Sequence, residues 1–202
     1  MIPLSVPNLC GNELKYVKRC IKTEWISTAG NYISLFEKKV ASYLNSKYAV
    51  ACINGTSALQ VALRILEVGN GDEVIVPTLT FIAPINSVIY NNAKPIFMDC
   101  DNFYNMDVEK TIKFIKNETV FRNNFTFNKK TKKRIPVILP VHLWGNAARL
   151  EELVKICKER NISIVEDAAE SFGTKYTNGN LKNRFTGTIG KVGCLSFNGN
   201  KI

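Results

Sequence analysis

Three features that would each define a class of protein are missing from this 202-residue sequence. No apolar run approaches the roughly 18 to 20 residues of a membrane-spanning helix, and residues 1–5 lack the basic and apolar regions of a signal peptide. Only one histidine is present, and none of the six cysteines forms a CxxC pair. We therefore expect a cytoplasmic protein with no membrane partner and no metal site, whose cysteines are reduced and mostly buried.

Acidic residues are also scarce, with 17 Asp and Glu against 27 Lys and Arg, which gives a formal charge of +10. Much of the excess lies in residues 128–134, Asn-Lys-Lys-Thr-Lys-Lys-Arg, within an Asn-, Lys- and Phe-rich segment, 117–134. We interpret this segment as a solvated loop or hairpin excursion between core elements. Nucleic-acid binding would also explain the charge, but no recognisable module interleaves aromatic and basic residues, so we expect no nucleic-acid partner.

Apolar side chains make up 46% of the chain, which is enough for one α/β domain or for one domain plus the start of another. Apolar runs typical of buried strands alternate with segments of helical period, which predicts a mainly parallel sheet covered on both faces. The expected strands are 48–53, 73–76, 95–98, 135–141, 162–165 and 192–197, and the helices between them are 57–68, 82–91, 108–115 and 149–160. Two earlier helices, 13–22 and 32–44, are expected to form an entry arm.

Ligands of open α/β sheets gather beyond the carboxyl ends of the strands, so polar residues that follow apolar runs are the first candidates for a site. One such place is 54–59, Asn-Gly-Thr-Ser-Ala-Leu, where a glycine turn leads into a helix. Free N–H groups and the helix dipole could hold a phosphate there. The pattern equally fits an ordinary turn in which Thr56 or Ser57 caps the helix.

Two further places follow apolar runs. In 164–170, several carboxylates lie at the end of a predicted buried strand. Because removing a carboxylate from water is costly, we expect Asp167 to have a partner: a pyridinium nitrogen, the N–H groups of a helix that it caps, or a cation in a buried ion pair. In 195–201, a strand and a polar turn end in Lys201. A lysine in a dry pocket loses its proton readily, as an amine that forms an imine must. An ordinary surface lysine could equally occupy such a position. Rossmann binding of a dinucleotide is less compatible, because no GxGxxG occurs.

Six motifs occur along the chain in a characteristic order and spacing. They are 25–30 Trp-Ile-Ser-Thr-Ala-Gly, 55–59 Gly-Thr-Ser-Ala-Leu, 77–83 Pro-Thr-Leu-Thr-Phe-Ile-Ala, 140–145 Pro-Val-His-Leu-Trp-Gly, 166–170 Glu-Asp-Ala-Ala-Glu and 196–201 Ser-Phe-Asn-Gly-Asn-Lys. Together they resemble the DegT/DnrJ/EryC1/StrS sugar aminotransferases over the whole chain, which implies pyridoxal 5′-phosphate (PLP) as cofactor.

The resemblance implies the large domain of a fold-type I PLP transferase, a three-layer α/β sandwich with a mixed, mainly parallel sheet. It divides the chain into an N-terminal helical arm, 1–47, and a PLP-binding domain, 48–202, which includes the basic excursion at 117–134. The family continues beyond its lysine into a smaller C-terminal domain, whereas this chain stops at Ile202.

The resemblance also implies roles for single residues. Lys201 would hold PLP as a Schiff base and shuttle the proton, and Asp167 would keep the pyridine nitrogen protonated. Phe81 would stack on the ring, although without the resemblance a core aromatic is the simpler interpretation. Glu170 would lie near the ring hydroxyl, at a position where the family also has Gln or His. The residues implied for the phosphate are Gly55, Thr56, Ser57 and Ser196.

On the substrate side, Trp25 and Ser27 lie in a segment that contacts substrate in the family. We group His142 with them, as a structural neighbour of the cofactor rather than as an acid–base catalyst. The implied homodimer transfers an amino group, with glutamate as the expected donor, to a nucleotide-linked 4-keto-6-deoxy sugar.

The Ser-Phe-Asn-Gly-Asn-Lys motif, the opening 11–13 Gly-Asn-Glu and the basic insert are similar to the subgroup associated with legionaminic-type sugars. This similarity implies a UDP- or GDP-linked N-acetylhexosamine on the way to a nonulosonic acid. The alternative is a truncated, catalytically inactive PLP-fold module with a binding or regulatory role.

Overall fold

The computed structural model describes residues 2, 6–28 and 30–201. These residues form two compact units, which we describe separately. The first contains the described residues up to 51 together with those from 198 onward, and the second contains residues 52–197. The sequence predicted the boundary after residue 47, with the end of the chain in the larger domain.

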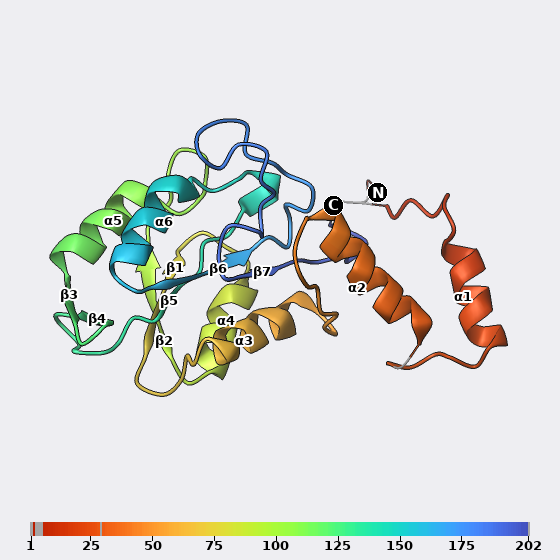
Figure 1. Cartoon of the computed structure of the whole chain (residues 1–202), viewed down its shortest axis with the longest axis horizontal. Helices are drawn as coiled ribbons and strands as arrows, with labels where there is room; N and C mark the ends of the chain where they lie inside the picture. Colours follow the sequence, from red (N-terminus) through yellow and green to blue (C-terminus); the bar gives the residue numbers. More distant parts are fainter. Residues whose placement is uncertain (1, 3–5, 29, 202) are drawn as a thin grey trace. The chain divides into compact units, whose positions relative to one another are not determined.

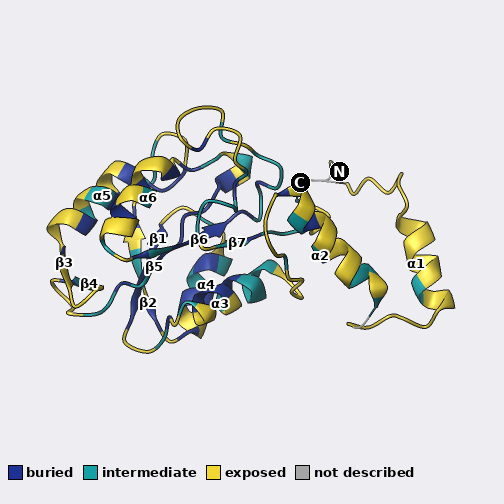
Figure 2. Ribbon diagram, viewed as in Figure 1, coloured by how far each residue is buried: buried dark blue, intermediate teal, exposed yellow. Residues whose placement is uncertain are grey.

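The first unit contains two helices, α1 (Glu13–Lys22) and α2 (Asn31–Tyr43), close to their predicted bounds. Helix α1 begins after Asn12 and is strongly amphipathic, yet none of its residues is buried, as Figure 2 shows. In the described part of the chain, no helix is both long and apolar enough to span a membrane.

The strand predicted at 48–53 is not formed, and this prediction was wrong. Tyr48, Val50 and Ile53 are 72%, 80% and 92% exposed, and the segment pairs with no described strand. An apolar run forms a strand only where a neighbouring strand satisfies its backbone groups. Within the segment, the Ala51 N–H instead donates to the Glu37 carboxylate, at 2.8 Å.

The second unit is built on a five-stranded sheet in the order β2-β1-β5-β6-β7, in which every adjacent pair is parallel. The mainly parallel α/β fold predicted from the sequence is thus confirmed. The strands are β1 (Glu73–Pro77), β2 (Lys94–Met98), β5 (Val137–Ile138), β6 (Ser163–Asp167) and β7 (Val192–Cys194). The helices are α3 (Gly55–Ile65), α4 (Ile82–Tyr90), α5 (Val108–Asn117) and α6 (Leu150–Glu159), and a short 3-10 turn, η1 (Leu143–Gly145), follows β5.

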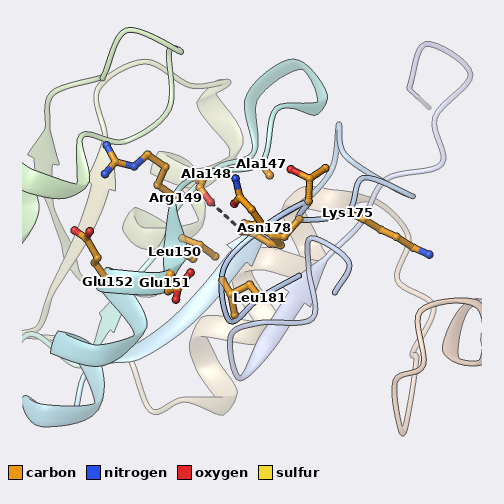
Figure 3. A pocket seen from close by; sticks show the side chains of 11 residues that line it. Ala147, Ala148, Arg149, Leu150, Glu151, Glu152, Lys175, Asn178 and Leu181 are labelled. Carbon is orange, nitrogen blue, oxygen red and sulfur yellow. Dashed lines mark hydrogen bonds between the residues drawn. The ribbon is translucent and has the colours of Figure 1, made fainter. Parts of the chain in front are cut away.

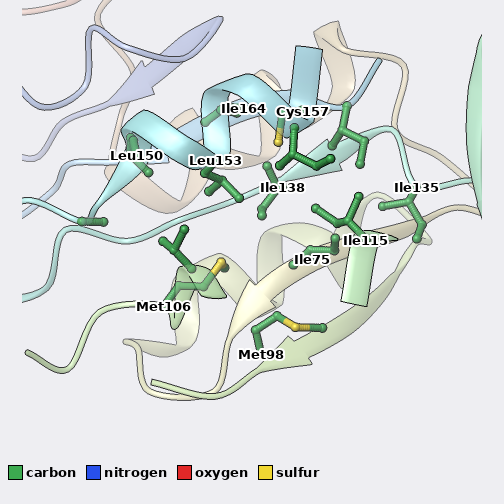
Figure 4. Packing of buried hydrophobic residues seen from close by; sticks show 14 of the residues in the cluster. Ile75, Met98, Met106, Ile115, Ile135, Ile138, Leu150, Leu153, Cys157 and Ile164 are labelled. Atoms are coloured by element: carbon green, nitrogen blue, oxygen red, sulfur yellow. The ribbon is translucent and has the colours of Figure 1, made fainter. Parts of the chain in front are cut away.

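Two apolar cores hold the helices against opposite faces of this sheet, with α5 and α6 on one side and α3 and α4 on the other (Figure 1). Successive strand residues alternate between them, because side chains of a strand point to opposite faces. Ile75, Ile138 and Ile164 face α5 and α6, in the core shown in Figure 4. Their neighbours Val137 and Val165 face α3 and α4.

The basic excursion is a two-stranded antiparallel hairpin, β3 (Thr119–Arg122) and β4 (Phe125–Asn128), rather than an irregular loop. The run that follows is only partly solvated. Arg134 forms a bidentate ion pair with the buried Asp72, at 2.8 and 2.7 Å, and Lys129 donates to the Asn117 carbonyl. This pairing ties the excursion to the start of β1.

All six cysteines are free thiols. The expectation that most of them are buried was wrong, because only Cys157 and Cys194 are. These two belong to the two apolar cores of the second unit, whereas Cys10 and Cys52 are exposed in segments that no sheet or helix layer covers.

Candidate functional site

The amino end of α3 carries three of the residues predicted to hold a phosphate. Asn54 caps the helix, since its side-chain oxygen accepts the Ser57 N–H at 2.8 Å. The cap is thus Asn54, and neither Thr56 nor Ser57 fills that role. The first N–H groups of a helix have no partner within the helix, and they point along its positive dipole end.

Ser196, the fourth predicted phosphate residue, lies beside this helix start. A Cβ built on Gly55 would meet the Cβ of Ser196 at 4.0 Å and no other neighbour within that range. Residues 55 and 196 are far apart in the sequence and come together because β7 leads the chain to the start of α3. The structure thus brings Ser196 beside the backbone N–H groups at the start of α3.

Asp167 ends β6 and is 5% exposed. Its side chain accepts the N–H of Ala169 at 3.0 Å, and its backbone carbonyl accepts the N–H of His142 at 3.0 Å. A buried carboxylate at a strand end needs cations or donors facing it. The position is therefore compatible with a pyridinium partner.

Glu166 and Asp167 are adjacent in sequence but serve opposite faces of the sheet. The side-chain alternation that sends Ile164 toward α5 and α6 and Val165 toward α3 and α4 puts Glu166 on the first face and Asp167 on the second. Asp167 thus shares its face with the helix starts of α3 and α4. Glu166 is separated from them by the sheet.

Glu166 forms a buried network that was not predicted from the sequence. It is completely buried and accepts four hydrogen bonds, from His142 Nε2 and from the backbone N–H groups of Gly187, Ile189 and Gly190, at 2.6 to 2.9 Å. Burial acts to raise the pKa of Glu166, but the His142 hydrogen bond and the N–H donors outweigh it and hold the pKa below its ordinary value.

The single histidine is part of this network. The Ala148 N–H donates to His142 Nδ1 at 3.0 Å, so Nδ1 carries no proton and Nε2 donates to Glu166. His142 is completely buried, with both nitrogens engaged. We therefore assign it the structural role and remove it from the proposed substrate contacts.

The glycines at 187–193 have a packing role. A Cβ on Gly190 would lie 2.5 Å from the Ile164 carbonyl oxygen, and one on Gly193 would lie 2.0 Å from the Gly187 carbonyl oxygen. The loop therefore packs directly on β6 and delivers its N–H groups to Glu166. The clustering of three glycines after a buried carboxylate was the available signal.

Phe81 immediately precedes α4 and is 68% exposed, which does not fit a core aromatic. It lies where the chain leaves β1, at the carboxyl edge of the sheet. Beside it, the Thr80 hydroxyl is buried and has no hydrogen-bond partner in the described part of the chain. Phe81 thus lies at the carboxyl edge of the sheet, at the start of a helix on the face that Asp167 shares.

Glu170 connects this edge to the loop after β5. Its carboxylate accepts the backbone N–H of Trp144 at 2.9 Å. Glu170 follows β6 and Trp144 follows β5, so the contact joins two neighbouring strand ends. Trp144 belongs to the 140–145 motif, for which the sequence predicted no role at this position.

The remaining predicted residues lie in the first unit. The Lys201 N–H closes a turn with the Asn198 carbonyl at 2.8 Å, and its side chain is half-buried. Trp25 is 57% exposed, and Ser27 is exposed. The roles of Lys201, Trp25 and Ser27 in binding cofactor and substrate remain predictions.

A pocket of about 410 Å³ lies at the start of α6 (Figure 3). It is formed between the loop that begins with Ala147 and a second loop carrying Lys175, Tyr176 and Leu181. Two of its lining residues are joined, since the Tyr176 hydroxyl donates to the Ala148 carbonyl at 2.9 Å. No predicted site residue lines this pocket, so the candidate site is the polar edge described above.

Comparison with known proteins gives consistent results. The GDP-perosamine synthase of Escherichia coli O157:H7 is 41% identical over 200 residues, which cover 99% of this chain and 50% of that protein. EpsN of Bacillus subtilis, a protein named as a pyridoxal phosphate-dependent aminotransferase, is 35% identical over 205 residues, which cover 100% of this chain and 48% of that protein. The chain thus spans about half the length of these relatives.

A solved DegT DnrJ EryC1 StrS aminotransferase from Brucella abortus superposes with a TM-score of 0.80 at 34% identity, covering 93% of this chain and 47% of that structure. Residues 7–202 also match the sequence profile of one family. The chain belongs to the DegT/DnrJ/EryC1/StrS aminotransferase family.

Proposed function

We propose that the protein is a PLP-dependent aminotransferase that acts on a nucleotide-linked sugar. One observation carries the proposal: at the carboxyl edge of the sheet, Asp167 shares a face with the capped start of α3 and with the start of α4, which Phe81 precedes. Ligand sites of parallel sheets form at this edge. Family membership supports the same chemistry.

The residues present fit the cofactor. The start of α3, with Gly55 open toward Ser196, offers N–H and hydroxyl donors to a phosphate, at the positive end of a helix dipole. Asp167 would pair with the ring nitrogen, Phe81 would stack on the ring, and Glu170 would lie near the ring hydroxyl.

Bound PLP would supply an electron sink for the electrons released at the carbon that carries the amino group. The buried Asp167 would keep the ring nitrogen protonated. Lys201 would attach the cofactor through its amine and move a proton between the amino donor and the cofactor. Phe81 and the α3 start would fix the orientation in which this proton moves.

The finer proposal concerns the substrates. Glutamate is the proposed amino donor, and a UDP- or GDP-linked 4-keto-6-deoxy N-acetylhexosamine is the proposed acceptor, of the type that leads to legionaminic acid. The E. coli relative is named for a GDP-linked sugar, which favours GDP. We also propose a cytoplasmic homodimer, which sedimentation would test.

The test is borohydride reduction of the full gene product after incubation with PLP, followed by peptide mass spectrometry. We expect the reduced cofactor on Lys201 and its loss in Lys201→Ala, while Lys182→Ala, a change at an exposed lysine, retains it. Amination of GDP- and UDP-linked keto sugars by glutamate is then measured. Reduced cofactor mapped to another lysine would contradict the mechanism, and an adduct without turnover of any keto sugar would favour the inactive binding module.

A further inference from the structure

Two exposed aromatic residues at the carboxyl edge of the sheet adopt a backbone conformation that is unfavourable for them. Tyr104 has φ 66° and Trp144 has φ 53°, both in the left-handed region. Trp144 interrupts the 3-10 turn η1 with this conformation. Bulky residues rarely adopt it, and when they do so the surrounding structure must impose it.

The two rings contact each other although the residues are 40 positions apart. Their centroids are 5.3 Å apart with the planes at 65°, an edge-to-face pair. Tyr104 follows β2, and Trp144 follows β5. The rings are nevertheless 52% and 63% exposed, so little apolar surface is buried in return for the strained backbone.

Asn105 clamps the two loops together. It is 2% exposed, its side-chain oxygen accepts the Leu143 N–H at 3.2 Å, and its side-chain nitrogen donates to the Asn146 carbonyl at 3.4 Å. The Asp101 carboxylate also accepts the Asn105 N–H at 3.1 Å, which fixes the turn that carries Tyr104. These bonds anchor the backbone on both sides of Trp144 and directly after Tyr104, while the two rings lie at the surface.

Glu170 fixes the other side of Trp144. Its carboxylate holds the Trp144 N–H at 2.9 Å, and it follows the strand that ends in Asp167. The aromatic pair is therefore connected by one side chain to the proposed cofactor edge. Strained and over-determined residues of this kind cluster where a ligand is bound.

We propose that Tyr104 and Trp144 form an aromatic wall against which a ring of the nucleotide-sugar acceptor stacks. The inference rests on the proposed function and adds a specificity-determining surface to it. A nucleobase and the apolar face of a sugar ring share the flat, weakly polar chemistry that an aromatic wall recognises. Asn105 is a positioning residue for this wall.

The kinetic test uses Tyr104→Ala, Trp144→Ala and Asn105→Ala in the full gene product. We expect each variant to raise the KM for the nucleotide sugar by about tenfold, the size of one lost stacking contact. The rate at which glutamate converts bound PLP should stay within about twofold of the parent rate, because glutamate has no ring that would stack on the wall. Phe103→Ala is the matched control, since Phe103 is an exposed aromatic of the same turn, and it should change neither quantity.

A binding test needs no turnover. The intrinsic fluorescence of the parent and of Trp144→Phe is titrated with GDP and, separately, with the GDP-linked sugar. Quenching of the Trp144 signal by GDP alone would identify the base as the stacked ring, and quenching only by the sugar nucleotide would identify the sugar. An active parent whose Trp144 signal neither ligand changes, with an unaltered KM in Trp144→Ala, would overturn the aromatic wall. A parent that forms no PLP adduct would instead overturn the proposed function.

Discussion

Removing Glu166 should destabilise the second unit more than any surface change, because this carboxylate satisfies four buried donors. In Glu166→Ala the His142 Nε2–H and the N–H groups of Gly187, Ile189 and Gly190 lose their acceptor. An unsatisfied buried donor costs about 1–3 kcal/mol, and breaking a buried charged pair costs about 3–5 kcal/mol. The four losses are not additive, since the loop can relax, so we expect about 3–5 kcal/mol.

Urea unfolding followed by circular dichroism measures this change. Glu166→Gln should fall between the parent and Glu166→Ala, because the amide keeps one acceptor oxygen but turns an N–H₂ group toward the donors. Glu109→Ala is the control, since Glu109 belongs to an exposed pair with Arg149, and its unfolding midpoint should hardly move. A Glu166→Ala protein that unfolds at the parent's urea concentration would refute the network as a source of stability.

Three other outcomes follow from the site and the cores. Asp167→Ala should retain some PLP yet lose orders of magnitude in glutamate-driven conversion of the cofactor, and a normal rate measured spectroscopically would contradict the assignment. Because the folded-state pKa of Glu166 lies below its ordinary value, its contribution is complete above the ordinary carboxyl pKa and is lost as the pH falls from there through the lowered folded-state pKa. Acid unfolding of the parent should therefore be steeper than that of Glu166→Gln, and equal slopes would contradict this sign. Burial raises the pKa of Cys157 to about 12, so about one thiol in ten thousand is ionised at pH 8, and iodoacetamide should label the exposed Cys10 and Cys52 but label Cys157 only on unfolding.

The sequence by itself determined the fold class, because the alternation of apolar runs with helical periods is a local property. It also located the places where polar residues follow strands, including Asp167 and the start of α3. The family motifs supplied most of the proposed site residues in the same way, since each motif is contiguous along the chain.

The sequence could not show which apolar segments pair with a neighbouring strand. Residues 48–53 have the pattern of a strand, but strand pairing is a contact between distant segments, and the described chain supplies none for them. For the excursion at 117–134 the sequence left a loop and a hairpin open, and the pairing of β3 with β4 decided for the hairpin. The prediction that most cysteines are buried was wrong because burial also depends on contacts between distant segments.

Only the tertiary structure separated the roles of neighbouring residues. Glu166 and Asp167 look equivalent in the sequence, but strand alternation and the glycine loop make the first a buried acceptor, while the second lies on the face of the proposed cofactor. Tyr104 and Trp144 lie in unrelated segments and meet because Asn105 bridges two loops. The sequence specifies the chemistry of each side chain. Which side chains share a buried, water-free environment is decided by the packing of segments that are far apart in the sequence.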